Sequence, residues 1–431
     1  METTENQKQN SIFQSTTAKM IMVGLLTLFL LIPLDYVKSL INERGEIQKQ
    51  VVTETSQKWG EKICFYGPIL KIPYKDLSNN QERMAYFFPE QLINSTEVNM
   101  EKPLKRSLYK SNVFSAKMNF KGNYNFSDLD FKDIPLENVL WEKATIIIQT
   151  TNLKSITSEV NIDLGNKKYT FKPNYNHQKS DFETLETAII DMDQIRNSSK
   201  FNLNINYNGS KQIQIIPIGK TTSASMKSNW HSPSFNGNFL PINKKISSDG
   251  FQASWRILNF NRSFDQQHYD NLPDLKKYAF AVDFITPVNE YQQNERATKY
   301  GFLVIGLTFL VFFLIQTISK INIHIFQYSM IGLALIMFYT LLISITEHSS
   351  FKTAYMISAT SVIILVTLYS VSILKNIKFP IFIGVSLTAL YLFIFVIIQL
   401  ENYALLVGSI GLFLILSAVM YFSKNIDWNK N

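Results

Sequence analysis

The chain has 431 residues, of which 42 are Lys or Arg and 34 are Asp or Glu, so its formal net charge is +8. Its mean hydropathy of zero averages two unlike regions. Residues 38–299 carry 34 basic and 28 acidic side chains, whereas residues 300–423 carry six charged side chains in total. This segregation excludes an ordinary soluble enzyme. The basic excess is spread without a run of five like charges, which argues against nucleic acid as a partner.

The first apolar stretch, residues 20–34, follows Lys8 and Lys19. A small-residue cleavage site does not follow it, so the sequence favours an uncleaved signal anchor over a cleaved signal peptide. We assign residues 1–19 to a cytoplasmic N-terminus and residues 20–37 to the first transmembrane helix. This helix must continue through Pro33 to reach the length that crosses about 30 Å of hydrocarbon.

The polar region, residues 38–299, begins with helical spacing of apolar residues over 38–60 and then changes to strand patterns. Alternation in 201–207 and 211–216, on either side of Asn208-Gly209, predicts a β-hairpin. Spacing over residues 184–195 predicts a helix. Other strand patterns cover residues 118–126 and 144–150. We therefore expect residues 38–299 to form a large, mainly-β, sandwich-like extracytoplasmic domain.

Residues 300–422 contain five more apolar segments, each of roughly 19–22 residues and almost free of charge, as spanning helices require. They cover residues 300–318, 325–345, 354–374, 379–400 and 403–422. The predicted fold class is thus a multi-pass α-helical membrane protein with a large mainly-β extracytoplasmic domain. It has six transmembrane helices, one N-terminal and five C-terminal.

Orientation follows from the basic residues near the helix ends, which favour the cytoplasmic side. Six spans place both termini on one side of the membrane. That side carries Lys8, Lys19, Lys320, Lys375, Lys378, Lys424 and Lys430, whereas the opposite short loops carry only Lys352. We predict that both termini are cytoplasmic, with residues 423–431 as a cytoplasmic tail and residues 38–299 outside the cytoplasm.

Catalytic and cofactor motifs are missing from the sequence. Gly219-Lys220-Thr221 lacks the upstream glycine of a phosphate-binding loop, and the five histidines have no metal-ligand spacing. Cys64 is the single cysteine, so it has no disulfide partner in the chain, and its apolar neighbours predict a buried thiol rather than a nucleophile. We therefore predict no catalytic residue, no cofactor and no metal site, and these absences favour a non-enzymatic protein over an enzyme.

Two groups of residues remain as candidate functional residues. Glu347 and His348 end the third span at the outer surface, where an acid beside an imidazole can relay protons or bind substrate. The simpler interpretation is a helix end that faces water. Arg256 and Arg262 follow Trp255 and can form an anion or peptide site, against the simpler interpretation of turns between strands.

Several segments resemble the CreD family of bacterial inner-membrane proteins. The likeness keeps its order over about residues 20–400 and rests on residues 31–34, 40–44, 67–74, 88–92, 106–109, 234–241, 250–255, 287–291, 323–328 and 344–348. Two positions depart from the family pattern: Ser107 replaces a Gly after Arg106, and Asn289 replaces an Asp after Pro-Val. The resemblance implies a bacterial inner-membrane location with residues 38–299 in the periplasm. It also implies a link to a two-component system that responds to the envelope, and to tolerance of β-lactams and colicins, but no catalytic residue.

Our first hypothesis is therefore an inner-membrane protein that supports cell envelope integrity and the response to envelope stress. Its periplasmic domain would bind an envelope protein or a peptidoglycan-related ligand, and its helices would contact membrane lipids. Two alternatives stay open. One is a membrane-embedded enzyme or a handler of lipid or peptidoglycan precursors near Glu347 and His348. The other is a transporter or channel, although charged groups inside the spans are almost absent and only a pore lined by hydroxyls and carbonyls remains.

Overall fold

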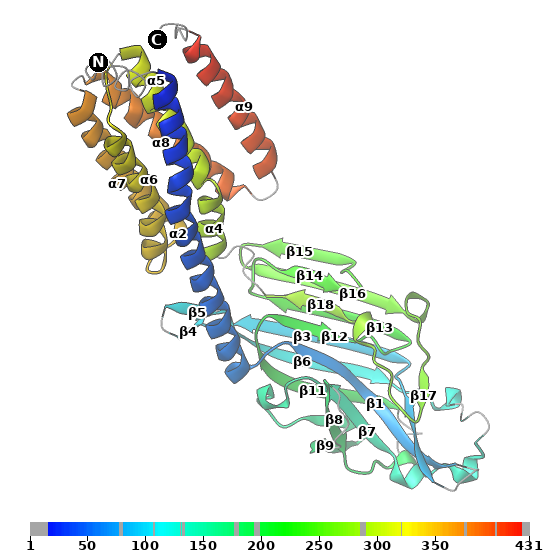
Figure 1. Ribbon diagram of the computed structural model, residues 1–431. Coiled ribbons are helices and arrows are strands. Elements are labelled where there is room, and N and C mark those ends of the chain that lie inside the picture. Colours follow the sequence, from blue (N-terminus) through cyan, green and yellow to red (C-terminus); the bar gives the residue numbers. More distant parts are fainter. Residues whose placement is uncertain are drawn as a thin grey trace, which may run out of the picture. The chain divides into compact units, whose positions relative to one another are not determined.

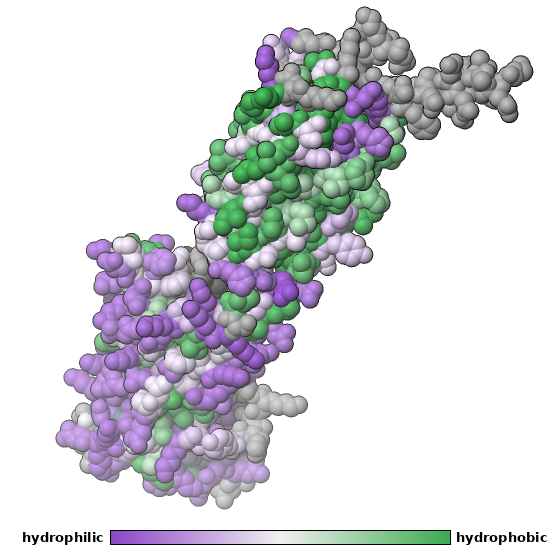
Figure 2. Space-filling model, turned by 90° about the vertical axis from the view of Figure 1, so that its left-hand side faces the viewer, coloured by the Kyte–Doolittle hydropathy of each residue, from purple (hydrophilic) through white to green (hydrophobic). Residues whose placement is uncertain are grey.

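The computed structural model describes residues 16–76, 81–106, 108–129, 131, 134–175, 181–193, 199–284, 290–319, 321–374, 377–400 and 403–424. The chain divides into two compact units: a helical unit, residues 1–49 with 288–431, and a β unit, residues 50–287 (Figure 1). This division groups residues 38–49 and 290–299, which lie at the ends of the proposed periplasmic region, with the helices. Figure 2 shows hydrophobic side chains over the visible face of the helices and mostly hydrophilic ones over that of the β unit.

The helical unit confirms the predicted fold class, because six helices in the described part of the chain are long and apolar enough to cross a membrane. They are α2 (Thr16–Trp59), α5 (Gly301–Ser319), α6 (Ile325–Thr346), α7 (Phe351–Leu374), α8 (Lys378–Gln399) and α9 (Ala404–Ser423). The predicted spans agree with these bounds to within about three residues for α5 to α9. Helix α2 continues through Pro33 and contains both the predicted anchor and the helical pattern of residues 38–60.

A short helix, α4 (Glu290–Lys299), precedes α5 and was not predicted. Its buried residues include Tyr291 and Asn294, and it contacts α6, α7 and α8. Aromatic rings of α6, α7 and α8 pack in the core of the bundle, where Phe338 lies 5.2 Å from Tyr355 and 4.6 Å from Tyr391 between ring centroids. The helices satisfy their own backbone hydrogen bonds, which the interior of a membrane requires.

The β unit confirms the mainly-β prediction. One 16-stranded sheet has the order β14-β18-β12-β1-β7-β10-β9-β8-β11-β6-β3-β13-β16-β15, with β2 paired to β1 and β17 paired to β2. The strands are β1 (Ile63–Lys75), β2 (Glu82–Phe87), β3 (Gln91–Met100), β6 (Phe114–Asn123), β7 (Thr145–Thr150), β8 (Asn161–Leu164), β9 (Lys167–Asn174), β10 (Glu183–Thr187), β11 (Lys200–Gly209), β12 (Gln212–Ile215), β13 (Thr221–Ser228), β14 (Ser234–Gly237), β15 (Asn243–Ser247), β16 (Gly250–Leu258), β17 (Gln267–Tyr269) and β18 (Phe280–Asp283). A separate hairpin joins β4 (Leu104–Arg106) to β5 (Tyr109–Ser111).

The sheet folds over a shared apolar core. Strand β1 is almost wholly buried, whereas β11 alternates buried and more exposed side chains with a period of two. Phe65 of β1 stacks on Phe120 of β6 with ring centroids 4.0 Å apart, although these strands are not neighbours in the sheet. Cys64 is buried beside Phe65, as predicted, and burial raises the pKa of its thiol to about 12. The core therefore lies between the two halves of the sheet, in a sandwich-like arrangement.

Two local predictions were wrong. The proposed hairpin does not form, because β11 pairs with β6 and β8 whereas β12 pairs with β1 and β18. Lys211 takes a left-handed φ of 67° between the strands, and the chain crosses there from one half of the sheet to the other. The helix predicted over residues 184–195 is also absent over 184–191. Its first residues form β10, because pairing with β7 and β9 buries Leu185, while residues 194–195 lie outside the described part.

Candidate functional site

Glu347 lies at the C-terminal cap of α6, and its ionic partner is Arg44 of α2. The Arg44 Nε atom is 3.7 Å from Glu347 Oε1, and the side chains are 44% and 17% exposed. His348 is exposed. Next to Glu347, the Thr346 hydroxyl lies 3.4 Å from Asn294 Oδ1 of α4. Asn294 is fully buried, and its Nδ2 atom has no hydrogen-bond partner among the described residues. A proton relay between Glu347 and His348 stays a prediction.

Trp255, Arg256 and Arg262 occupy different environments. Trp255 is 2% exposed, donates from its indole to the Phe239 carbonyl and stacks on Phe280, whereas Arg256 is exposed. Consecutive side chains of a strand point to opposite faces, so these two diverge. Glu347 and His348 belong to the helical unit, and this trio belongs to the β unit.

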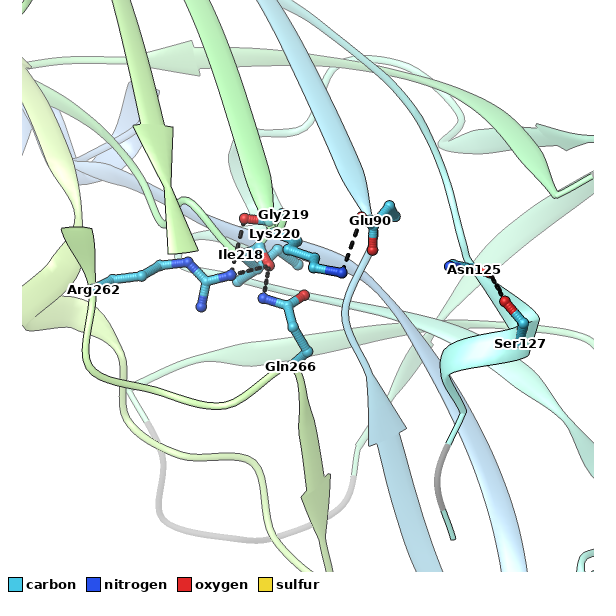
Figure 3. A network of polar contacts seen from close by, with 8 residues as sticks. All are labelled: Glu90, Asn125, Ser127, Ile218, Gly219, Lys220, Arg262 and Gln266. Atoms are coloured by element: carbon cyan, nitrogen blue, oxygen red, sulfur yellow. Dashed lines mark hydrogen bonds and ion pairs between the residues drawn. The ribbon is translucent and has the colours of Figure 1, made fainter. Parts of the chain in front are cut away.

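Arg262 is buried, and its guanidinium binds main-chain oxygens. It donates to the carbonyls of Ile218 and Gly219, at 3.3 and 3.0 Å (Figure 3). It also donates to the carbonyl of Phe264 at 3.2 Å. Burial lowers its pKa to about 10. The guanidinium thus ties the segment that follows β12 to the segment that follows β16. Lys220, one residue on, lies 3.2 Å from Glu90 Oε1, so this lysine belongs to a surface ion pair in the segment that only superficially resembled a phosphate loop.

The β unit contains a cavity of about 1050 Å³, which we call the polar cavity. Its wall is one face of neighbouring strands. Register places Tyr86 opposite Lys71, Glu186 opposite Ile147, and Thr184 opposite Gln149, and alternation along each strand turns these side chains to the same side. The remaining lining residues are Met84, Asn174, Asp181, Phe182, Asp270, Asn271, Leu272, Pro273, Asp274 and Lys276.

A partly buried ion pair lies in the wall of the polar cavity. Lys71 Nζ is 2.7 Å from Glu186 Oε1, and each side chain is only 16% exposed. Thr145 donates to the same carboxylate oxygen at 2.6 Å, and Asn174 donates to the other at 2.5 Å. Burial of the Glu186 carboxyl raises its pKa, but the hydrogen bonds and charge of its partners outweigh burial, so the net pKa is lowered. Glu186 therefore remains ionised and held in one position.

The other charges of the polar cavity also have partners inside the protein. Lys276 Nζ lies 2.7 Å from Asp181 and 4.8 Å from the centroid of the Phe182 ring. Asp270 accepts from Arg83 at 3.2 Å and from the Tyr74 hydroxyl at 3.1 Å. The side chain of Asp274 accepts from the Lys276 backbone amide at 3.0 Å. These contacts engage both lysines of the lining and leave amides, a hydroxyl, aromatic rings and the Asp274 carboxylate for a ligand.

Tyr86 is half-buried in this wall. Burial raises the pKa of its phenol, and the nearby carboxylates of Glu186 and Asp270 raise it further. The phenol is therefore neutral at physiological pH and can both donate and accept a hydrogen bond. Such a group suits a ligand that is itself uncharged.

Sequence patterns did not identify the polar cavity. Lys71 and Tyr74 lie in the segment 67–74, which is one of the segments that carry the family resemblance, and that resemblance was the one available signal. Glu186 fell in the wrongly predicted helix. Asp270 to Lys276 lie far from both in sequence and meet them only through the strand order. Among the described residues, no group of His, Cys, Asp and Glu is arranged to hold a metal ion.

Comparison with known proteins gives the family. Residues 15–429 match the family model described as Inner membrane protein CreD. The chain is 28% identical over 418 residues to the Inner membrane protein CreD of Escherichia coli strain K12, covering 93% of this chain and 91% of that protein. A crystal structure titled "putative nutrient binding protein", from Legionella pneumophila, is 8% identical and covers 57% of this chain and 80% of its own. Its TM-score of 0.26 is too low for an argument about fold. The family match spans nearly the whole sequence, so the chain belongs to the CreD family of inner membrane proteins.

Proposed function

We propose that this protein supports cell envelope integrity from the inner membrane, with its β unit in the periplasm and its polar cavity binding an envelope component. The observation that carries the proposal is the cavity itself. Its volume of about 1050 Å³ is at the upper end of the usual range for ligand sites, about 300–1,000 Å³. The excess of lysines at the proposed cytoplasmic ends of the spans supports this orientation.

The lining of the polar cavity favours an uncharged ligand that is rich in hydroxyl and amide groups. An anionic ligand would have to compete for the two lysines of the lining, which already pair with Glu186 and Asp181. Gln149, Thr184 and Asn271 offer neutral donors and acceptors, and Tyr86 and Phe182 offer rings on which a sugar can pack. We therefore propose a neutral glycan segment, several sugar units long, as the ligand class.

Calorimetric titration of the full chain in lipid nanodiscs with N-acetylchitotetraose, a neutral amide-bearing oligosaccharide, tests the ligand class. We expect saturable binding, and at least fivefold weaker binding for Gln149→Leu, because this change removes one hydrogen-bonding amide from the wall. Gln252→Leu, on an exposed position of β16, is the matched control and should bind as the wild type does.

Survival in a β-lactam tests the process. Cells that carry only Gln149→Leu should lose the tolerance that wild-type and Gln252→Leu cells keep. Absence of saturable binding to the wild type, or equal binding by the two variants, would refute the glycan proposal. Equal survival of the two strains would refute the link between the cavity and envelope integrity.

One observation favours the alternative site at the end of α6. The Asn294 Nδ2 atom, which has no hydrogen-bond partner in the part of the chain that the structure describes, is buried beside Thr346, next to Glu347. Glu347→Gln and His348→Ala test that alternative in the same survival assay. If both variants survive as the wild type does, chemistry at this position is discarded.

A further inference from the structure

Six neighbouring strands of the β unit carry a row of small neutral side chains on their outer face. The strands are β11, β6, β3, β13, β16 and β15, in this order across the sheet (Figure 1). Register sets one side chain of each strand opposite the next, and these side chains are Asn204, Asn119, Ser95, Ser225, Ser254 and Asn243. We call them the Asn/Ser row. With neighbouring strands about 4.8 Å apart, the row is about 24 Å long.

The Asn/Ser row faces away from the core and offers a low, hydrophilic surface. Phe120 and Met226, which neighbour row residues along β6 and β13, are buried, so the row itself points outward. Asn119 Nδ2 donates to Asn204 Oδ1 at 2.7 Å, which holds both amides against the sheet. At the other end of the row, four of its members line a groove of about 640 Å³: Ser95, Ser225, Ser254 and Asn243. Hydroxyls and amides can both donate to and accept from the hydroxyls of a ligand.

Basic side chains flank the Asn/Ser row on both sides. Two positions along the strands in either direction, register places Lys121 and Arg256 on one side of the row and Lys117, Lys227 and Lys245 on the other. All five are exposed. The structure describes every flanking position in these strands, and Glu97 is the one acid among them; it pairs with Lys227 at 3.2 Å. Five basic side chains and one acidic side chain give this face a net charge of +4, which attracts anionic ligands.

The composition of this face distinguishes between anionic partners. Neither the Asn/Ser row nor its flanking positions, all of them described, contain an aromatic residue, and Ile93 is their one large apolar side chain. A protein partner needs aromatic or apolar anchors, single-stranded nucleic acid stacks its bases on rings, and a membrane surface takes up apolar side chains. An acidic polysaccharide needs none of these, because it binds through carboxylates and hydroxyls. Its sugars also repeat at close to the spacing of strands, so successive sugars can lie over successive strands.

We propose that this face binds an extended polysaccharide that bears carboxylates, laid along the Asn/Ser row with its carboxylates at the flanking cations. The observations that support it are the row of hydroxyls and amides, the net charge of the face and its lack of rings. Arg256, a candidate for an anion site from the sequence, is joined there by lysines of three other strands. None of the residues of this face lines the polar cavity, so the site is separate from the one proposed for a neutral glycan.

Microscale thermophoresis of the full chain in phosphatidylcholine nanodiscs, titrated with an oligogalacturonate long enough to cross the six strands, tests this face. We expect saturable binding that weakens as salt is added. Lys117→Gln, Lys121→Gln and Lys245→Gln should each weaken it about threefold, the effect of one exposed ion pair, and the triple variant at least tenfold. The methyl ester of the same oligosaccharide is the uncharged probe. Any binding of the ester, a neutral glycan that suits the polar cavity, should be unchanged in these variants.

Two controls separate the charge of this face from other effects. Lys75→Gln, at the exposed end of β1, and Gln252→Leu, which keeps every charge of the face, should bind oligogalacturonate as the wild type does. An unchanged midpoint of urea unfolding shows that each variant is folded. Unchanged binding by the triple variant, or an equal loss in Lys75→Gln, would overturn the proposal. Phosphatidylglycerol vesicles are the competing probe: lysine-dependent binding of the vesicles without binding of oligogalacturonate would assign the face to a membrane surface instead.

Discussion

The two units of this protein use apolar side chains in opposite ways. In the β unit they gather between the halves of one sheet, and Phe65 is fully buried. In the helical unit many lie on the outside: Leu405 is 87% exposed and Phe413 is 68% exposed. The difference is one of solvent, because a membrane-facing surface loses nothing by exposing hydrocarbon to lipid. Exposed apolar side chains in these helices are therefore expected to contact lipid. Buried apolar side chains in the β unit are expected to stabilise its fold.

Removing a phenylalanine from each unit is the strongest test of this comparison. Phe65→Ala should destabilise the β unit by about 4 kcal/mol, because it leaves a cavity against Phe120. Phe413→Ala in α9 should change the stability of the β unit by less than about 0.5 kcal/mol. Urea unfolding followed by tryptophan fluorescence measures both, since four of the five tryptophans lie in residues 50–287. Similar losses in the two variants would contradict the comparison.

Sequence patterns predicted the membrane helices, whose positions depend on the composition of consecutive residues. The span predicted over residues 325–345 is α6, Ile325–Thr346, because length and lack of charge suffice to define a membrane helix. Sequence patterns failed to predict which strands pair with each other. Alternation marked β11 and β12 correctly as strands, but a hairpin is only one way to bury Ile213, and pairing with β1 buries it fully.

The candidate site shows the same division. Glu347 and His348 stood out because charges are rare near the spans, whereas Lys71 and Glu186 are ordinary charges in a polar region. They are 115 residues apart and meet only because β7 lies between β1 and β10. Arg262 was a candidate for an anion or peptide site, yet the structure surrounds its guanidinium with carbonyls, an environment that no local pattern encodes.

Acid should weaken the β unit through Glu186. Its lowered pKa means that its stabilising contribution is complete above the ordinary carboxyl value of about 4.3 and is lost as the pH falls through the folded-state pKa. Glu186→Gln leaves Lys71 without its ionic partner and should cost about 2 kcal/mol at pH 7. The difference between the wild type and the variant should shrink as the pH is lowered from 7 to 3, in the same urea assay.

Glu97→Gln is the matched control for Glu186. Glu97 pairs with Lys227 at 3.2 Å, but the side chains are 46% and 58% exposed, so its loss should cost less than about 1 kcal/mol. A difference between the wild type and Glu186→Gln that stays constant with pH would show that the carboxylate charge does not stabilise the polar cavity.

The smallest effect is expected at the ion pair of the helical unit. Arg44 is 44% exposed and lies 3.7 Å from Glu347, so Arg44→Gln and Glu347→Gln should each change thermal stability by less than about 0.5 kcal/mol. A double-mutant cycle in nanodiscs, read by thermal unfolding, measures the coupling between the two side chains. A coupling above about 1.5 kcal/mol would mean that the pair is desolvated, as Lys71–Glu186 is. The coupling can be small while Glu347→Gln cells lose β-lactam tolerance. The Glu347 carboxylate would then be needed for function in the cell but not for the stability of the fold.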